Sequence, residues 1–188
     1  SQNHFGHHSA VSSDMTRPSA TAGAGGPLVL LHGFPQTWFE WRLIMPALAE
    51  RYRVIAPDLR GLGDSSRPAG GYHKMRVAED VWELMAGELG HDSFFLVGHD
   101  WGGPVAYALA AAHRDAVRKL AILDVVIPGD GSDQFSTSQG RWHHGFHRTL
   151  DLPEALIAGR ERLYIAWFLK NFTAHPGMIP DDAIDEFA

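Results

Sequence analysis

The chain contains no cysteine, and several kinds of protein are excluded on that ground alone. Disulfide bonds, thiolate metal sites and cysteine nucleophiles all need a sulfur that these 188 residues do not have. The lack of disulfides does not fix a compartment, so the location stays unknown. Since no signal peptide is visible at the start, we expect the cytoplasm rather than secretion.

Long apolar runs and excess positive charge are also lacking. No stretch approaches the roughly 18 to 20 apolar residues of a membrane-spanning helix. The net charge is -6, and acidic and basic residues are interspersed, so there is no basic patch for nucleic acid or an anionic membrane surface. With 45% hydrophobic residues, the chain can bury a core. We predict a soluble protein that binds neither nucleic acid nor membrane.

Short apolar runs alternate with helical patterns through the first two thirds of the chain. The runs cover residues 27–31, 53–56, 94–98 and 120–123, and helical spacing covers 74–89 and 104–112. This alternation predicts an α/β fold, a mostly parallel sheet with helices on both faces. In such sheets, ligand sites form at the carboxyl ends of the strands. His32, Asp58, Asp100 and Asp124 each stand at such an end.

One strand end carries a motif with chemical meaning. Residues 98–103 read Gly-His-Asp-Trp-Gly-Gly and lie between an apolar run and a helix of small residues. This is the form of a nucleophile elbow, a sharp strand-to-helix turn that lifts one side chain above the sheet edge. The residue at the tip is Asp100, where esterases and lipases carry serine. The alternative is that Asp100 only caps the following helix.

Composition divides the chain into three parts. Residues 1–25 are polar and small, and we expect either a flexible segment or an edge strand. Residues 26–127 form the α/β core. Residues 128–188 begin with a polar loop and continue as a helical cap, with no further strand. We therefore expect the chain to be C-terminally incomplete.

Taken together, the motifs resemble those of the α/β-hydrolase superfamily, in its epoxide hydrolase and dehalogenase branch. The matching stretches are residues 32–35 (His-Gly-Phe-Pro), 58–65 (Asp-Leu-Arg-Gly-Leu-Gly-Asp-Ser), 98–103, Leu123-Asp124 and the segment from Trp142 to Tyr164. The resemblance implies the α/β-hydrolase fold with a helical cap and no cofactor or metal. It runs from about Gly26 to the end, and its similarity is greatest to epoxide hydrolases with a histidine and a tyrosine in the cap.

The resemblance implies a covalent mechanism. Asp100 would attack a saturated carbon and form an alkyl ester, for which an already ionised carboxylate needs no general base. The backbone N–H groups of Phe34 and Trp101 would form the oxyanion hole. Asp124 would be the relay acid that orients a histidine. That histidine lies far downstream in the family, and we expect it outside these residues.

The nature of the leaving group is left open between two substrate classes. In the cap, His143 matches the position of an epoxide oxygen donor. The predicted substrate contacts are His32 and Trp101 in the core and His144 and Tyr164 in the cap. Tyr164 also fits core packing. The alternative is a haloalkane or haloacetate dehalogenase. Haloalkane dehalogenases typically carry Asn in place of Phe34, and fluoroacetate dehalogenases carry arginines in place of Trp101 and Pro104, so epoxides are favoured.

Two further alternatives concern the chain as a whole. It is an inactive or incomplete half-domain, or it works with a complementing C-terminal polypeptide or as a homo-oligomer. The histidines at 143, 144 and 147 also suggest metal ligands, but no carboxylate or cysteine completes a set, so packed cap histidines are favoured. The predicted partner is a small-molecule epoxide or organohalide.

Overall fold

The computed structural model describes residues 6–12, 15–125 and 142–188. The chain divides into two compact units, Ser1–Ile127 and Pro128–Ala188. Among the described residues, no helix is long and apolar enough to cross a membrane.

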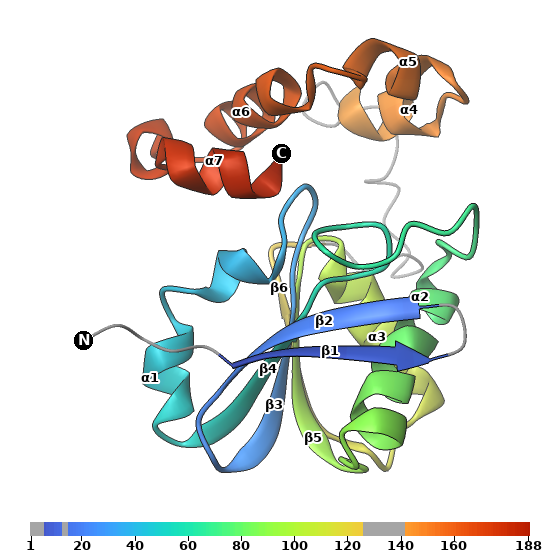
Figure 1. Cartoon of the computed structure of the whole chain (residues 1–188), viewed down its shortest axis with the longest axis vertical. Coiled ribbons are helices and arrows are strands. Elements are labelled where there is room, and N and C mark those ends of the chain that lie inside the picture. The colour runs from blue at the N-terminus through green and yellow to red at the C-terminus, as the bar shows by residue number, and fades with distance from the viewer. Residues whose placement is uncertain (1–5, 13–14, 126–141) are drawn as a thin grey trace. The chain divides into compact units, whose positions relative to one another are not determined.

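A six-stranded sheet forms the centre of the first unit (Figure 1). Its strands are β1 (Gly6–Ser12), β2 (Met15–Ala22), β3 (Gly26–Leu31), β4 (Tyr52–Pro57), β5 (Phe94–His99) and β6 (Val117–Leu123). They lie in the order β1-β2-β4-β3-β5-β6. Strands β3 to β6 are parallel, whereas β1 and β2 form an antiparallel pair that joins the sheet through β2 and β4. The predicted α/β fold is confirmed.

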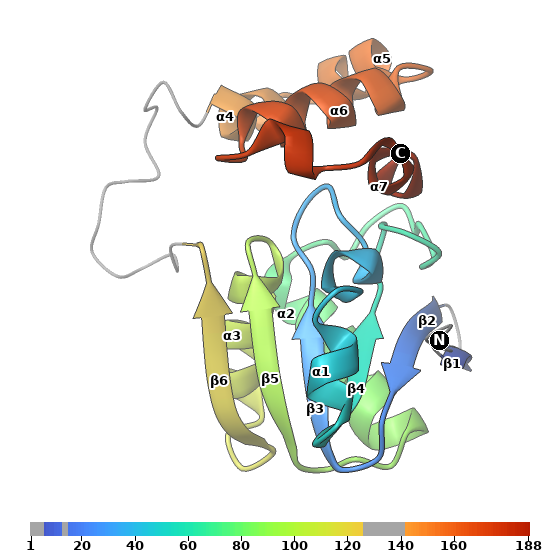
Figure 2. The same ribbon diagram turned by 90° about the vertical axis from the view of Figure 1, so that its left-hand side faces the viewer.

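Helices cover both faces of this sheet, as Figure 2 shows with α1 on the near face and α3 on the far one. The helical elements are η1 (Trp38–Trp41), α1 (Met45–Ala49), α2 (Lys74–Trp82), η2 (Glu83–Glu88) and α3 (Gly102–Ala112). Two buried clusters result. Val29, Leu31 and Leu96 pack with residues of α2 and α3, and Leu28, Leu30 and Val54 pack with Trp41 and Met45.

Side chains of β3 explain its central place. Residues 28–31 are all buried, as expected for a parallel strand that is covered on both faces. By contrast, β6 is largely exposed, with Leu123 43% accessible, and it forms one edge of the sheet within the described residues. The carboxyl ends of β3, β4, β5 and β6 therefore share one edge of the sheet, where the candidate residues stand.

The second unit is helical. Its elements are α4 (Trp142–Arg148), α5 (Leu152–Ile157), α6 (Glu161–Asn171), η5 (Pro176–Met178) and α7 (Asp181–Phe187). Helices α6 and α7 bury Ile165, Phe168 and Ile184. Aromatic rings hold α4 against α6, since the His143 ring lies edge-on to Phe168 at 5.2 Å between centroids.

Candidate active site

A tight turn joins β5 to α3 and presents Asp100 at its tip. The backbone of Asp100 has a φ of 45°, a left-handed conformation that is strained for most residues with a side chain. Gly98 permits the close packing of strand and helix: a Cβ there would lie 2.7 Å from the Gly102 carbonyl carbon and 2.8 Å from Ala106 Cβ. The glycines therefore allow the helix to begin directly behind the aspartate.

The carboxylate of Asp100 points back toward the loop after β3. Its Oδ1 accepts a hydrogen bond from the Phe34 backbone N–H at 2.9 Å. Helix α3 begins at Gly102, with Trp101 at its N-cap position and no side-chain capping bond. Gly33 makes this approach possible, because a Cβ at that position would lie 2.8 Å from Asp100 Cβ. The carboxylate is thus bound across the sheet edge and does not cap the helix.

Glu40 and His99 form a second layer behind this loop, and neither is among the residues predicted from the sequence. Glu40 Oε2 accepts the Gly33 N–H at 2.9 Å, and its Oε1 pairs with His99 Nδ1 at 2.7 Å. The hydrogen bond to Glu40 raises the pKa of His99. Because Gly33 and His99 directly precede Phe34 and Asp100, this pair fixes both sides of the Asp100 contact. No local pattern marks Glu40, which reads as a polar residue of a short helix.

His32 lies at the end of β3 and is held by backbone groups. Its side chain is fully buried, and its Nε2 accepts the Leu59 backbone N–H at 2.9 Å. The proton therefore lies on Nδ1, 2.9 Å from the Gly33 carbonyl oxygen, to which it donates. Burial lowers the pKa of His32, in keeping with a neutral ring. With both nitrogens bound to backbone, His32 ties the loops after β3 and β4 together, and its predicted contact with substrate stays a prediction.

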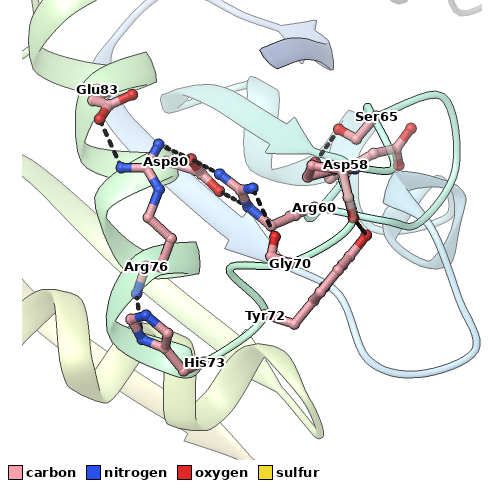
Figure 3. Close-up of polar contacts among 10 residues, drawn as sticks. Asp58, Arg60, Ser65, Gly70, Tyr72, His73, Arg76, Asp80 and Glu83 are labelled. Atoms are coloured by element: carbon pink, nitrogen blue, oxygen red, sulfur yellow. Dashed lines mark hydrogen bonds and ion pairs between the residues drawn. The ribbon is translucent and has the colours of Figure 1, made fainter. Parts of the chain in front are cut away.

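A network of polar side chains holds the loop after β4 (Figure 3). Asp58 accepts the backbone N–H groups of Trp38 and Asp64, and Ser65 Oγ donates to the Asp58 carbonyl oxygen. Arg60 makes a bidentate pair with Asp80 of α2, at 2.6 and 2.8 Å. The partners of Asp58 lie in η1 and in the loop after β4. Asp58 therefore holds these two segments together at the sheet edge.

Lys74 contacts Trp101 of the nucleophile turn, and it too is not among the residues predicted from the sequence. Its Nζ lies over the face of the Trp101 indole. Burial lowers the pKa of Lys74 to about 7, and the charge of Asp100 acts against this shift. In the sequence, Lys74 belongs to a charged helix start, a position that is usually solvated. Its contact depends on how α2 lies against α3, which the spacing of residues does not show.

Asp124 directly follows β6, at the same sheet edge. Its backbone also has a positive φ, 50°, and the preceding carbonyl of Leu123 accepts the Asp100 N–H at 3.1 Å. Asp124 is thus beside the nucleophile turn, and its charge is one of those that raise the pKa of His99. Its predicted relay role stays a prediction.

The cap residues form a cluster within the second unit. The His143 ring packs against His144, Phe168 and Phe172. The Tyr164 hydroxyl lies 2.6 Å from His147 Nε2, and burial raises the pKa of Tyr164. In the part of the chain that is described, no three histidine, aspartate or glutamate side chains gather as metal ligands. The roles of His143, His144 and Tyr164 toward substrate stay predictions.

An apolar groove of about 580 Å³ also lies on this unit. Its lining consists of Trp142, Phe146, Leu156, Ile157, Arg160, Leu163, Tyr164 and Trp167. Tyr164 therefore contributes to the groove and bonds to His147, in addition to packing against Phe168.

The fold and the turn together define the class of protein. The chain belongs to the α/β-hydrolase fold family, whose pattern it matches over residues 26–171.

Relatives within this family are more specific. A soluble epoxide hydrolase from Corynebacterium sp. (strain C12) is 44% identical over 188 residues, which are 96% of this chain and 65% of the relative. A fluoroacetate dehalogenase from Burkholderia sp. is 39% identical over 153 residues, or 77% of this chain and 50% of the relative. The solved structure of the epoxide hydrolase CorEH without ligand has a TM-score of 0.89 at 42% identity, covering 98% of this chain and 67% of that one. The present chain thus spans 65% and 50% of the two curated relatives' lengths.

Proposed function

We propose that this chain carries the nucleophilic part of an epoxide hydrolase, with Asp100 as the attacking group. The observation that carries the proposal is the carboxylate at the tip of the strand-to-helix turn, with its Oδ1 bound by the Phe34 N–H. A carboxylate is ionised at neutral pH and can attack carbon without a base. The strained three-membered ring of an epoxide suits such a nucleophile.

The first step forms a covalent intermediate. An Asp100 oxygen attacks an epoxide carbon, the carbon–oxygen bond opens, and a hydroxyalkyl ester remains once the ring oxygen takes up a proton. In the cap, His143 would hydrogen-bond that oxygen, with His144 and Tyr164 as further contacts to the substrate. No cofactor enters this scheme.

The second step hydrolyses the ester to a vicinal diol. Water attacks the ester carbonyl, and negative charge develops on its oxygen. The backbone N–H groups of Phe34 and Trp101 are proposed to bind that oxyanion, as donors whose orientation is fixed before the reaction. Asp124 would orient the histidine base that activates the water, and it would stabilise that base when protonated.

Dehalogenation is the second candidate, favoured by the similarity to a fluoroacetate dehalogenase and by the indole of Trp101 beside the nucleophile. An indole N–H can hold a departing halide. Against it, the resemblance implies Asn in place of Phe34 for a haloalkane dehalogenase. For a fluoroacetate dehalogenase it implies arginines in place of Trp101 and Pro104. The higher identity to an epoxide hydrolase points the same way.

Parallel incubation with an aryl epoxide and a haloalkane distinguishes these reactions. Intact-mass measurement follows the covalent adduct, while diol and halide are measured in solution. We expect adduct or diol from the epoxide, and neither product from Asp100→Asn. Halide release without reaction of the epoxide would make the protein a dehalogenase. Equal product from Asp100→Asn and from the unmodified chain would refute an aspartate nucleophile.

A further inference from the structure

Glu40 bridges the two loops that meet at the Asp100 carboxylate. It belongs to η1, and its Oε2 accepts the Gly33 N–H at 2.9 Å while its Oε1 pairs with His99 Nδ1 at 2.7 Å. The side chain is only 11% exposed, so these two contacts are largely shielded from water. Gly33 and His99 are themselves close, since a Cβ on Gly33 would lie 3.1 Å from His99 Nδ1. One carboxylate therefore fixes where the loop after β3 lies relative to the end of β5.

The next residues along the chain make the contact on which the proposed mechanism depends. Phe34 follows Gly33, Asp100 follows His99, and the Phe34 N–H donates to Asp100 Oδ1 at 2.9 Å. Glu40 thus lies one residue behind each end of this hydrogen bond. A group in this place acts through the backbone of its two neighbours, as a positioning residue.

The two ends of this hydrogen bond are held in different ways. On the nucleophile side, backbone groups fix Asp100: its N–H donates to the Leu123 carbonyl oxygen at 3.1 Å, and its own carbonyl oxygen accepts the Gly103 N–H at 2.9 Å. On the donor side, the Gly33 carbonyl oxygen is held by groups of its own loop, whereas the Gly33 N–H depends on the Glu40 side chain. Loss of Glu40 should therefore loosen the donor side and leave Asp100 in place.

We propose that Glu40 is a positioning residue for the second chemical step, in which the ester on Asp100 is opened. The inference rests on the proposed function of Asp100. In the ester, Oδ1 is the carbonyl oxygen, and the second oxygen carries the alkyl group. The water oxygen forms a bond to the carbonyl carbon, an electron pair of the C=O bond moves to Oδ1, and a proton of the water goes to the base. When the pair returns, the bond to the alkyl oxygen breaks, and that oxygen takes up a proton and leaves as the diol.

The Phe34 N–H affects the two steps in opposite directions. While the second Asp100 oxygen attacks the epoxide carbon, Oδ1 loses negative charge and its hydrogen bond weakens. While the ester is opened, negative charge grows on Oδ1 and the same hydrogen bond strengthens. Only an interaction that is stronger in the transition state than before it accelerates a step. An N–H held in place by Glu40 should therefore speed the opening of the ester and not its formation, whereas a residue that merely supports the fold would affect both steps.

The test measures the two steps separately by intact mass. A pulse of aryl epoxide forms the adduct, the excess epoxide is removed, and hydroxylamine is added. The hydroxylamine nitrogen attacks the same ester carbonyl without a base from the protein. Its proton passes to the departing alkyl oxygen, the diol leaves, and Asp100 keeps a hydroxamate. The rate at which the adduct is lost then reports how well Oδ1 is stabilised as an oxyanion.

Three variants separate reach from charge at position 40. Glu40→Leu removes both contacts at similar size. Glu40→Asp keeps the charge but is one carbon shorter, so it cannot reach Gly33 and His99 together. Glu40→Gln keeps the reach without the charge, because its amide oxygen can accept the Gly33 N–H and its NH₂ group can donate to neutral His99. Glu50→Leu, at the exposed C-cap of α1, is the matched control, and circular dichroism checks that every variant is folded.

Opening of the ester should slow by on the order of 10- to 100-fold in Glu40→Leu and by roughly 10-fold in Glu40→Asp, because loss of a whole oxyanion donor costs about 10²- to 10³-fold. Glu40→Gln and Glu50→Leu should stay within a few-fold of the unmodified chain. Formation of the adduct should stay within a few-fold in every variant. If Glu40→Leu does not fold, Glu40→Asp, which keeps a carboxylate at the site, carries the same comparison.

Three results would overturn the proposal. The first is an unchanged rate of ester opening in Glu40→Leu or in Glu40→Asp. The second is an equal slowing of formation and opening, which would make Glu40 a support of the fold alone. The third is a loss in Glu40→Gln as large as in Glu40→Leu, which would assign the effect to charge. In each case the adduct still forms and the proposed function stands. Absence of any adduct in the unmodified chain would instead refute Asp100 as the nucleophile, and the part of Glu40 with it.

Discussion

Close packing of β5 against α3 explains why the nucleophile turn has glycine at position 98. A methyl group on Gly98 would collide with the Gly102 carbonyl group and with Ala106 Cβ, at 2.7 and 2.8 Å. We expect Gly98→Ala to lower the free energy of unfolding by about 1–3 kcal/mol or more, as overpacking does. Chemical denaturation measures this change.

The matched control is Gly145→Ala in α4. A Cβ at Gly145 meets nothing within 4 Å, so alanine there should stabilise the protein by roughly 0.5–1 kcal/mol. Equal effects of the two substitutions would show that the turn does not depend on close packing at Gly98.

Some residues around the Asp100 turn belong to sequence motifs, whereas others are brought there only by tertiary packing. Asp100 and Phe34 belong to motifs, and the structure brings them together at 2.9 Å. Glu40 and Lys74 lie in ordinary helical sequence, and only tertiary packing gives them their partners. His32 belongs to a motif and was predicted to contact substrate, but its motif position did not show that both ring nitrogens bind backbone groups.

At the scale of elements, the Arg60–Asp80 pair fastens the loop after β4 to α2. Both side chains are only 6% exposed, so removing one partner leaves a buried charge. Arg60→Met should destabilise the protein by about 3 kcal/mol, near the lower end for a broken buried pair, because Arg76 still pairs with Asp80 at 3.0 Å. Urea denaturation is the measurement.

The double variant Arg60→Met with Asp80→Leu should recover most of that loss, since no buried charge remains. Arg162→Met, which removes an exposed ion pair with Asp185, should leave stability unchanged. If Arg60→Met behaves like Arg162→Met, the buried pair does not hold the loop.

Strands and helices of the core could be predicted because apolar runs and helical spacing are local signals. The prediction of a helix over 74–89 is matched by α2 followed by the π-helical segment η2, and the β5–α3 order follows from the elbow motif. The pairing of β2 with β4, and the placing of β1 outside β2, depend on contacts between distant residues. Such pairings leave no trace in a polar segment with few apolar positions.

The whole molecule should respond to pH through its buried cationic groups. Lys74 has a folded pKa of about 7, whereas the ordinary lysine pKa is 10.5, so between these two pH values the unfolded state binds more protons. The free energy of unfolding should therefore gain a contribution as pH rises from 7 toward 10. Lys74→Met should remove that contribution and Lys119→Met should not, when both are denatured at pH 8 and pH 10.

The histidines act at lower pH with opposite signs. Burial lowers the pKa of His32, so its contribution to stability falls as pH drops below about 6.5. The pKa of His99 is raised by Glu40. Its contribution to stability is therefore present below about pH 6.5 and is lost as pH rises through its folded pKa.

The Lys74 prediction has one contradicting outcome. If the difference in free energy of unfolding between Lys74→Met and the unmodified chain is the same at pH 8 and pH 10, the pKa of Lys74 is not lowered.

The central claim, that Asp100 is an alkylating nucleophile, is tested most directly by locating the ester. The chain is incubated with an aryl epoxide, quenched in acid and digested, and the peptides are sequenced by tandem mass spectrometry. The account predicts one hydroxyalkyl group on Asp100, and none on the same peptide of Asp100→Asn. A modification confined to other carboxylates or to histidines, with Asp100 unmodified and no diol formed, would contradict it.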